Sequence, residues 1–273
     1  MPTAVGELDL KLRKELDSFQ DLWKGGYFEG DPLDPLAPSS YMAIGYMSVL
    51  HAIYLACIRP YVGSGSSVLE IGPGRGAWTK TFLQAKEVWC LDALSAEHNG
   101  FWQYLGQPAN VKYFQVSDFS CRMLPDDHFT YLFSFGALCH VSLAGISEYM
   151  KNLHPKLKSG AHGFILVADY GKYNAAIGDE MPRLNILDLV ARRMAPKNPL
   201  LRWTFRRIID KIRTAYVPGH PLDVNEDEIP RPSRFFHAGV DRTCEMLQGL
   251  GYEVLDPDIG ASLRDPIIHF QKP

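Results

Sequence analysis

The sequence lacks the cysteine patterns that would define a disulfide or metal scaffold. Five cysteines occur in 273 residues, and none forms a CxxC pair or another spacing typical of a metal site. Their odd number and their apolar surroundings indicate reduced, mostly buried thiols, so we expect a cytoplasmic protein. These cysteines are Cys57, Cys90, Cys121, Cys139 and Cys244.

Long apolar segments and targeting signals are also scarce. The N-terminus is rich in charged residues between Glu7 and Glu15, so it does not resemble a secretory signal. Residues 41–58 have no formally charged side chain over a length that approaches a membrane-spanning helix. Glycine, serine and histidine lower the hydrophobicity of this segment, and its apolar residues recur at spacings of three and four. We therefore expect a helix packed on a globular domain.

The sequence has no large excess of charge of one sign. Its net charge is −3, with 46% hydrophobic and 22% charged residues, which is ordinary for a globular protein and argues against a general nucleic-acid binder. The length suits one large α/β domain with added cover better than two independent domains.

What the sequence does contain is an alternation of short apolar segments with helical patterns. The expected strands cover residues 68–71, 87–91, 111–116, 129–135, 163–168, 251–255 and 266–270. The expected helices cover residues 1–25, 77–83, 149–157 and 240–250. This order predicts an α/β fold with a doubly wound, mostly parallel sheet. We divide the chain into an N-terminal helical cap, 1–60, and a main domain, 61–273, with a helical insertion at 171–235.

Residues 68–78 read as a buried strand that runs into a glycine turn and then into a helix. Glycines in such a turn allow the backbone to approach a ligand closely. The spacing Gly72-x-Gly74-x-x-Ala77 satisfies the dinucleotide fingerprint, so a nicotinamide-dependent oxidoreductase is one interpretation. Glu70 argues against it, because a carboxylate there would repel a pyrophosphate but not a cofactor with sulfonium and ammonium groups.

Acidic and small residues follow the other expected strands, at the edge where parallel sheets bind ligands. Asp92 lies 20 residues after Gly72, where a carboxylate can accept hydrogen bonds from both ribose hydroxyls. Asp118 could accept from an adenine amine, and Gly136 leaves room for a ligand. The alternative for both aspartates is a simple helix N-cap.

The series Glu70-x-Gly72-x-Gly74-x-Gly76, with Asp92, Asp118 and Gly136, resembles the class I S-adenosylmethionine (SAM) methyltransferases over residues 68–255. The resemblance implies a seven-stranded sheet whose last strand is antiparallel, and SAM as cofactor. It implies that the glycines line the methionine part, Asp92 the ribose and Asp118 the adenine. The expected cofactor-binding residues are Glu70, Gly72, Gly74, Gly76, Asp92, Ala93, Asp118, Phe119, Phe135 and Gly136. A non-catalytic SAM-binding protein remains an alternative.

The segment after the fourth expected strand distinguishes methyltransferase classes. Residues 134–141 lack the Asn-Pro-Pro-Tyr motif of amide and nucleobase N-methyltransferases, and the chain lacks the aspartate pattern of metal-dependent catechol-type enzymes, so we expect no metal. What remains resembles the small-molecule O-methyltransferases, many of which have a histidine at the position of His140. Methyl transfer to a hydroxyl requires removal of its proton, so His140 is a candidate base; a capping or packing role is the alternative. Tyr170 and His237 are further catalytic candidates.

The insertion contains a strongly basic stretch. Residues 183–213 hold nine basic residues against Asp188 and Asp210, a net charge of +7. Interleaved apolar residues predict two amphipathic helices that cover the acceptor site. Three interpretations of this positive charge remain. It can belong to a solvent-exposed helical face, it can attract an anionic small-molecule acceptor, or it can bind an acidic partner or a membrane surface. The sequence carries no sign of the oligomeric state.

Overall fold

A computed structural model of the chain describes residues 4–19, 23–28, 30–36, 48–177, 236–262 and 265–273. The chain divides into two compact units, one formed by Met1–Asp169 with Glu226–Pro273 and the other by Tyr170–Asn225. Only helix α5, Tyr170–Ile177, is described in the second unit. The basic stretch 183–213 therefore lies outside the described residues. Among the described helices, none has the length and apolar character needed to cross a membrane.

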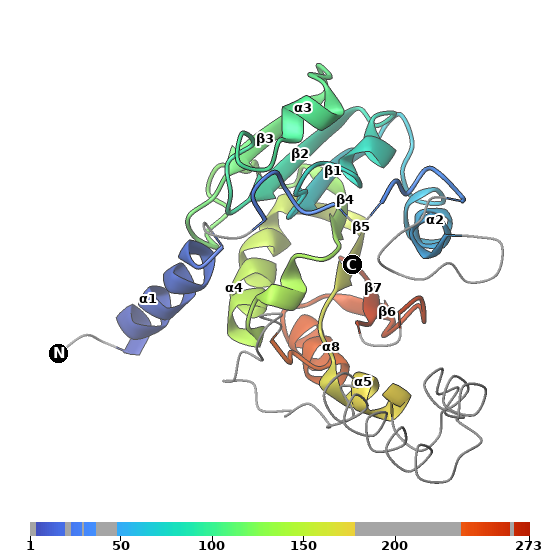
Figure 1. The fold of residues 1–273 in the computed structure, drawn as a ribbon. Coiled ribbons are helices and arrows are strands. Elements are labelled where there is room, and N and C mark those ends of the chain that lie inside the picture. Colours follow the sequence, from blue (N-terminus) through green and yellow to red (C-terminus); the bar gives the residue numbers. More distant parts are fainter. Residues whose placement is uncertain (1–3, 20–22, 29, 37–47, 178–235, 263–264) are drawn as a thin grey trace, which may run out of the picture. The chain divides into compact units, whose positions relative to one another are not determined.

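The first unit is built on one seven-stranded sheet with the order β3-β2-β1-β4-β5-β7-β6 (Figure 1). Neighbours among β1 to β5 pair in parallel, and β7 runs antiparallel to both β5 and β6. This topology confirms the expected doubly wound sheet with an antiparallel last strand. The strands are β1 Ser67–Ile71, β2 Glu87–Asp92, β3 Val111–Gln115, β4 Phe129–Ser134, β5 Leu157–Leu166, β6 Glu253–Asp256 and β7 Ile267–Gln271.

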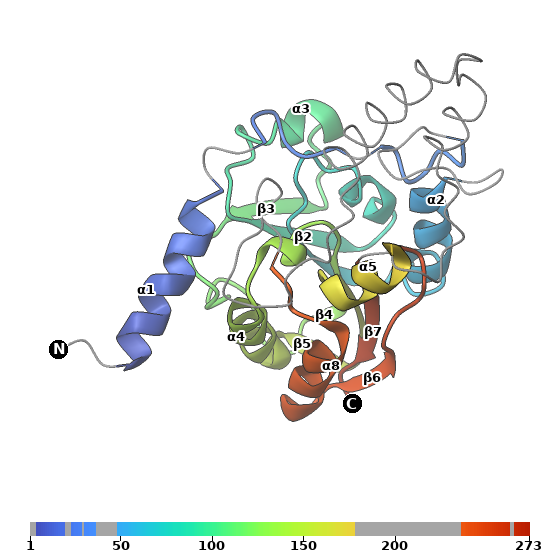
Figure 2. The same ribbon diagram turned by 60° about the horizontal axis from the view of Figure 1, so that its bottom comes forward.

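Helices cover both faces of the sheet (Figures 1 and 2). On one face, α4 (Leu143–Leu153) packs beside α8 (Val240–Gly249), and α1 (Ala4–Asp17) adds apolar side chains to the same cluster. On the other face, α2 (Val49–Ile53) continues as a π-helix, Tyr54–Ile58. The short α3, Phe101–Leu105, follows β2. The apolar faces of these helices close the core on both sides of the strands.

The helix expected from residue 77 is not formed, and this prediction was wrong. A 3-10 helix, Thr79–Phe82, takes its place. The hydroxyl of Thr79 donates to Glu70 at 2.6 Å, and that of Thr81 donates to the Trp78 carbonyl at 2.6 Å. Such side-chain bonds, together with β-branching, compete with regular α-helix.

The helix expected over 149–157 is displaced toward the N-terminus. The Ser142 hydroxyl accepts from the N–H of Gly145 at 3.2 Å and caps α4 one residue before Leu143. Pro155, which has no backbone N–H, lies in the 3-10 turn that follows α4. Strand β5 consequently begins at Leu157 instead of 163.

The helix expected over 1–25 is shorter than expected and ends at Asp17. In the segment expected to be helical over 41–58, Ser48 is extended and helix begins at Val49, continuing to Ile58. Residues 41–47 lie outside the described residues. The remaining expected strands differ from the observed ones only at their ends.

Candidate functional site

The glycine turn after β1 brings three segments of the chain together. Gly72 has a φ of +70°, donates its N–H to the Leu91 carbonyl at 2.7 Å, and would place an added Cβ 2.1 Å from the Cβ of Ala137. Gly74 has a φ of +52°, and its added Cβ would lie 3.0 Å from the Tyr27 carbonyl oxygen. The turn therefore needs glycine to fit between β2, the loop after β4 and the N-terminal segment.

A pocket with about 900 Å³ of empty space, partly open to solvent, lies against this turn. Its wall is formed by the glycine turn, the end of β2, the loop after β4, and residues before and after the end of α1. Of the expected cofactor-binding residues, six line it: Gly72, Gly74, Asp92, Ala93, Phe135 and Gly136.

Asp92 is the only formally charged residue among the described residues that line this pocket. Its carboxylate accepts from the N–H groups of Leu94 at 2.8 Å and Gly74 at 3.2 Å. Burial raises the pKa of Asp92 to about 6, against the lowering effect of these N–H groups. Each carboxylate oxygen has a second lone pair, so Asp92 can still accept from hydroxyls of a ligand.

Glu70, one of the expected cofactor-binding residues, is buried. Its side chain is 2% exposed and does not line the pocket. It accepts from Thr79, and the Cys90 thiol lies 3.6 Å from the same oxygen. Burial raises the pKa of Glu70 to about 7. The hydrogen bond from Thr79 links Glu70 at the end of β1 to the 3-10 helix that follows the glycine turn. A contact between Glu70 and a cofactor stays a prediction.

Asp118, Phe119 and Gly76 also lie outside the pocket wall. Asp118 accepts from the N–H of Ser120 at 2.8 Å, and Phe119 is buried with its ring edge-on to Tyr149. Gly76 packs on Phe101. A second cavity reaches Ser117, just before Asp118, and shares Leu16 and Ala93 with the main pocket. The adenine role of Asp118 and Phe119 stays a prediction.

His140 lines the pocket, whereas the two other catalytic candidates do not. Tyr170 is buried at the start of α5. His237 is buried in a segment that reaches the ends of two strands, because the N–H of Phe236 donates to the Cys139 carbonyl and that of Gly239 to the Ala168 carbonyl. The structure therefore places only His140 against the space that a ligand would fill.

The N-terminal aromatic residues are the part of the site that sequence reasoning missed. Phe19, Trp23 and Tyr27 line the pocket, and Trp23 lies with its ring centroid 4.9 Å from that of His140. Trp78 is buried, packs on Phe135 and also lines the pocket. The spacing of four between Phe19, Trp23 and Tyr27 is the only signal of this wall in the sequence, and it reads equally well as one face of a helix.

Among the described residues, no group of three or more histidine, cysteine, aspartate or glutamate side chains is placed to hold a metal ion. The expectation that the protein binds no metal stays a prediction.

Comparison with solved structures shows the same fold. An S-adenosylmethionine-dependent methyltransferase from Mesorhizobium loti aligns with a TM-score of 0.53 and 18% identity, over 82% of this chain and 98% of that chain. A protein described as a possible exported protein from Bordetella parapertussis aligns with a TM-score of 0.51 and 13% identity, over 82% of this chain and 67% of that one. No protein-family model and no curated protein matches the sequence. The fold is thus that of the class I SAM-dependent methyltransferases.

Proposed function

We propose that this protein is a SAM-dependent methyltransferase. The observation that carries the proposal is the position of Asp92, whose carboxylate stands in the pocket wall at the end of β2 and is bonded to the backbone of the glycine turn. A nucleoside bound across the ends of parallel strands presents its ribose hydroxyls to such a group. The fold supports the same conclusion.

The residues of the pocket fit SAM. Bound SAM supplies an activated methyl group on a sulfonium sulfur. Asp92 would accept from the ribose hydroxyls, Gly72, Gly74 and Gly136 leave space beside the backbone, and Ala93 gives an apolar wall for the base.

The first experiment measures thermal unfolding with S-adenosylhomocysteine, the product of methyl transfer. At about 100 times its dissociation constant, the ligand should stabilise the wild type by about 2.7 kcal/mol. Asp92→Ala should lose most of this shift, whereas Asp126→Ala, an exposed carboxylate outside the pocket wall, should keep it. No shift in the wild type, or a shift with NADH alone, would contradict the proposal and favour an oxidoreductase.

For the acceptor, we propose a hydroxyl group of a small molecule, with His140 as general base. The support is that His140 lines the pocket. His140→Ala should lower turnover by roughly 100-fold while S-adenosylhomocysteine binding changes little. The acceptor can be sought by incubating metabolite extracts with methyl-labelled SAM. Binding of SAM without any labelled product would favour the non-catalytic alternative.

The proposals for the remaining regions rest on sequence. We propose that the protein is cytoplasmic, that residues 1–60 form an N-terminal helical cap, and that residues 171–235 cover the acceptor site. If residues 183–213, with a net charge of +7, attract an anionic acceptor, its Michaelis constant should rise with salt while that of SAM responds less. The double variant Arg206→Glu and Arg207→Glu should have the same effect as salt.

A further inference from the structure

The N-terminal residues are anchored to the cofactor domain by a buried carboxylate. We call the described residues Leu12–Phe19 and Trp23–Phe28 the N-terminal cover. Glu15, 9% exposed, accepts from the hydroxyl of Ser142 at 2.8 Å and from its N–H at 3.3 Å. The same hydroxyl accepts from Gly145 and caps α4. A buried carboxylate is costly without such partners, so α1 is held at the start of α4.

A second anchor lies at the other end of the cover, on the glycine turn. The N–H of Gly25 donates to the His98 carbonyl at 2.9 Å, and Nε of Arg75 donates to the Gly25 carbonyl at 2.7 Å. The N–H of Arg75 donates to the Tyr27 carbonyl at 3.3 Å. The cover thus bonds to the same turn that carries Gly72 and Gly74.

Gly26 makes this second anchor possible. Its φ is +79°, and an added Cβ would lie 2.2 Å from the Asn99 carbonyl oxygen and 2.9 Å from the backbone nitrogen of Arg75. Both atoms belong to the backbone and cannot move aside as a flexible side chain could. A side chain at position 26 is therefore incompatible with the seated cover.

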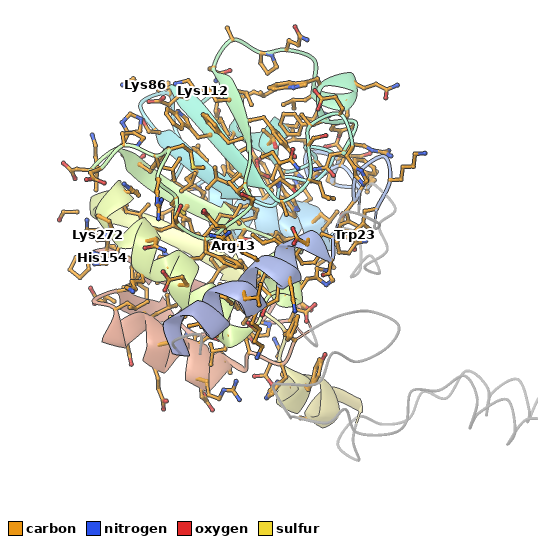
Figure 3. All side chains as sticks on the ribbon, turned by 90° about the vertical axis from the view of Figure 1, so that its left-hand side faces the viewer. Arg13, Trp23, Lys86, Lys112, His154 and Lys272 are labelled. Carbon is orange, nitrogen blue, oxygen red and sulfur yellow. The ribbon has the colours of Figure 1, made fainter. Side chains whose placement is uncertain are left out.

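Between the two anchors, the cover presents aromatic rings to the pocket. Phe19 stacks on Trp23 with ring centroids 5.8 Å apart, and both contact the ring of His140. Trp23 has a φ of +47°, and its carbonyl accepts from the N–H of Gly26 at 2.7 Å. In Figure 3, Trp23 lies at the end of the fold opposite to Lys86 and His154, which precede β2 and β5. This is the end at which Asp92 lines the pocket.

We propose that the N-terminal cover is part of the SAM site, with Trp23 and Tyr27 as binding residues that retain the cofactor and hold His140 in place. The inference rests on the proposed function, since it takes SAM as the ligand of this pocket. Because the cover forms one wall of this partly open pocket, release of the anchor of Gly25 and Gly26 on Arg75 and Asn99 widens the path by which the cofactor leaves. The sequence motif of the fold contains none of these cover residues.

The test measures dissociation of S-adenosylhomocysteine by stopped flow, with tryptophan fluorescence as the signal because Trp23 and Trp78 line the pocket. Gly26→Ala should increase the dissociation rate about tenfold or more. This is the change expected when the barrier to dissociation falls by the contribution of roughly one hydrogen bond. The matched control is Gly63→Ala, where an added Cβ meets nothing within 4 Å. The control should dissociate at the wild-type rate.

A second variant covers the case in which Gly26→Ala does not fold. Arg75→Ala removes the donor to the Gly25 carbonyl and leaves the backbone of the turn unchanged, so it should also speed dissociation. A folded Gly26→Ala or Arg75→Ala protein that releases the ligand at the wild-type rate would overturn the inference and leave the proposed function standing. A wild type that does not bind S-adenosylhomocysteine would overturn both.

Discussion

The two ends of the sheet use acidic side chains in opposite ways. At the amino end, Glu87 accepts from Ser67, from Trp89 and from His128. Burial opposes its ionisation, but these hydrogen bonds outweigh burial and lower the pKa of Glu87. At the carboxyl end, burial raises the pKa of Glu70 to about 7 and that of Asp92 to about 6.

We interpret this difference as one between a carboxylate that stabilises the fold and carboxylates at or near the proposed cofactor site. Glu87 gains from being charged in the folded state, because its partners are already in place. Glu70 and Asp92 are held where their charge is unfavourable, a condition found more often at functional sites than elsewhere. The predictions below test this contrast, from the largest expected effect to the smallest.

The largest effect is expected at the turn that shapes the pocket. Gly72→Ala should lower the free energy of unfolding by about 3 kcal/mol, from left-handed backbone strain and from overlap with Ala137. Gly260→Ala, with a φ of +75° and nothing within 4 Å of an added Cβ, carries only the strain and should lose about 1 kcal/mol. Denaturant unfolding measures both. Equal losses would show that the contact with Ala137 is not tight.

The pH dependence of stability should come next. Glu70 has a pKa of 4.5 as its ordinary value and about 7 in the fold, so the folded state binds more protons between these pH values. The free energy of unfolding should therefore fall as pH rises from about 4.5 to about 7, by up to about 3 kcal/mol from this group. Glu70→Gln should flatten the profile measured by denaturant unfolding. An unchanged slope would mean that Glu70 is ionised throughout.

A pair of substitutions should separate stability from binding. Glu87→Gln should lower the free energy of unfolding by about 1–2 kcal/mol, because charged hydrogen bonds are weakened, and should leave the stabilisation by S-adenosylhomocysteine intact. Asp92→Asn should do the reverse, with stability near neutral pH kept or increased and ligand stabilisation lost. Thermal unfolding with and without ligand measures both. If Glu87→Gln also lost its stabilisation by S-adenosylhomocysteine, the carboxylates at the amino and carboxyl ends of the sheet would not differ in function as inferred.

The smallest effect is expected from Lys112, whose ammonium group lies beside Glu87. Nζ of Lys112 lies 3.7 Å from Glu87 and 4.0 Å from the centre of the Trp89 ring, and its side chain is half exposed. Lys112→Ala should cost less than about 1 kcal/mol, as solvent-exposed ion pairs do. Denaturant unfolding at low and high salt measures it. A larger, salt-sensitive loss would show that the ion pair stabilises Glu87 more than its neutral donors do.

The strands and the glycine turn follow from the sequence because their signals are local. A run such as Val68 to Ile71 is apolar except at Glu70, and it is buried at every position, as expected for a strand covered on both faces. The helix predicted from residue 77 does not form, because side-chain hydrogen bonds compete with the regular α-helical pattern there. The clearest case is Thr79, whose hydroxyl donates to Glu70. The start of α4 was missed because the cap at Ser142 is shared with Glu15, 127 residues away in the chain.

By itself, the sequence determined the α/β class, the place of the cofactor turn and the acid at the end of β2, since each depends on neighbours a few residues apart. Only the tertiary structure decided which side chains face the pocket. Glu70 and Asp92 belong to neighbouring strands, yet one is buried under the turn and the other lines the cavity. The wall formed by Phe19, Trp23 and Tyr27 arises from contacts between segments far apart in the chain, at Ser142, Arg75 and Asn99. No local pattern encodes such contacts, because they depend on where the sheet brings the chain back.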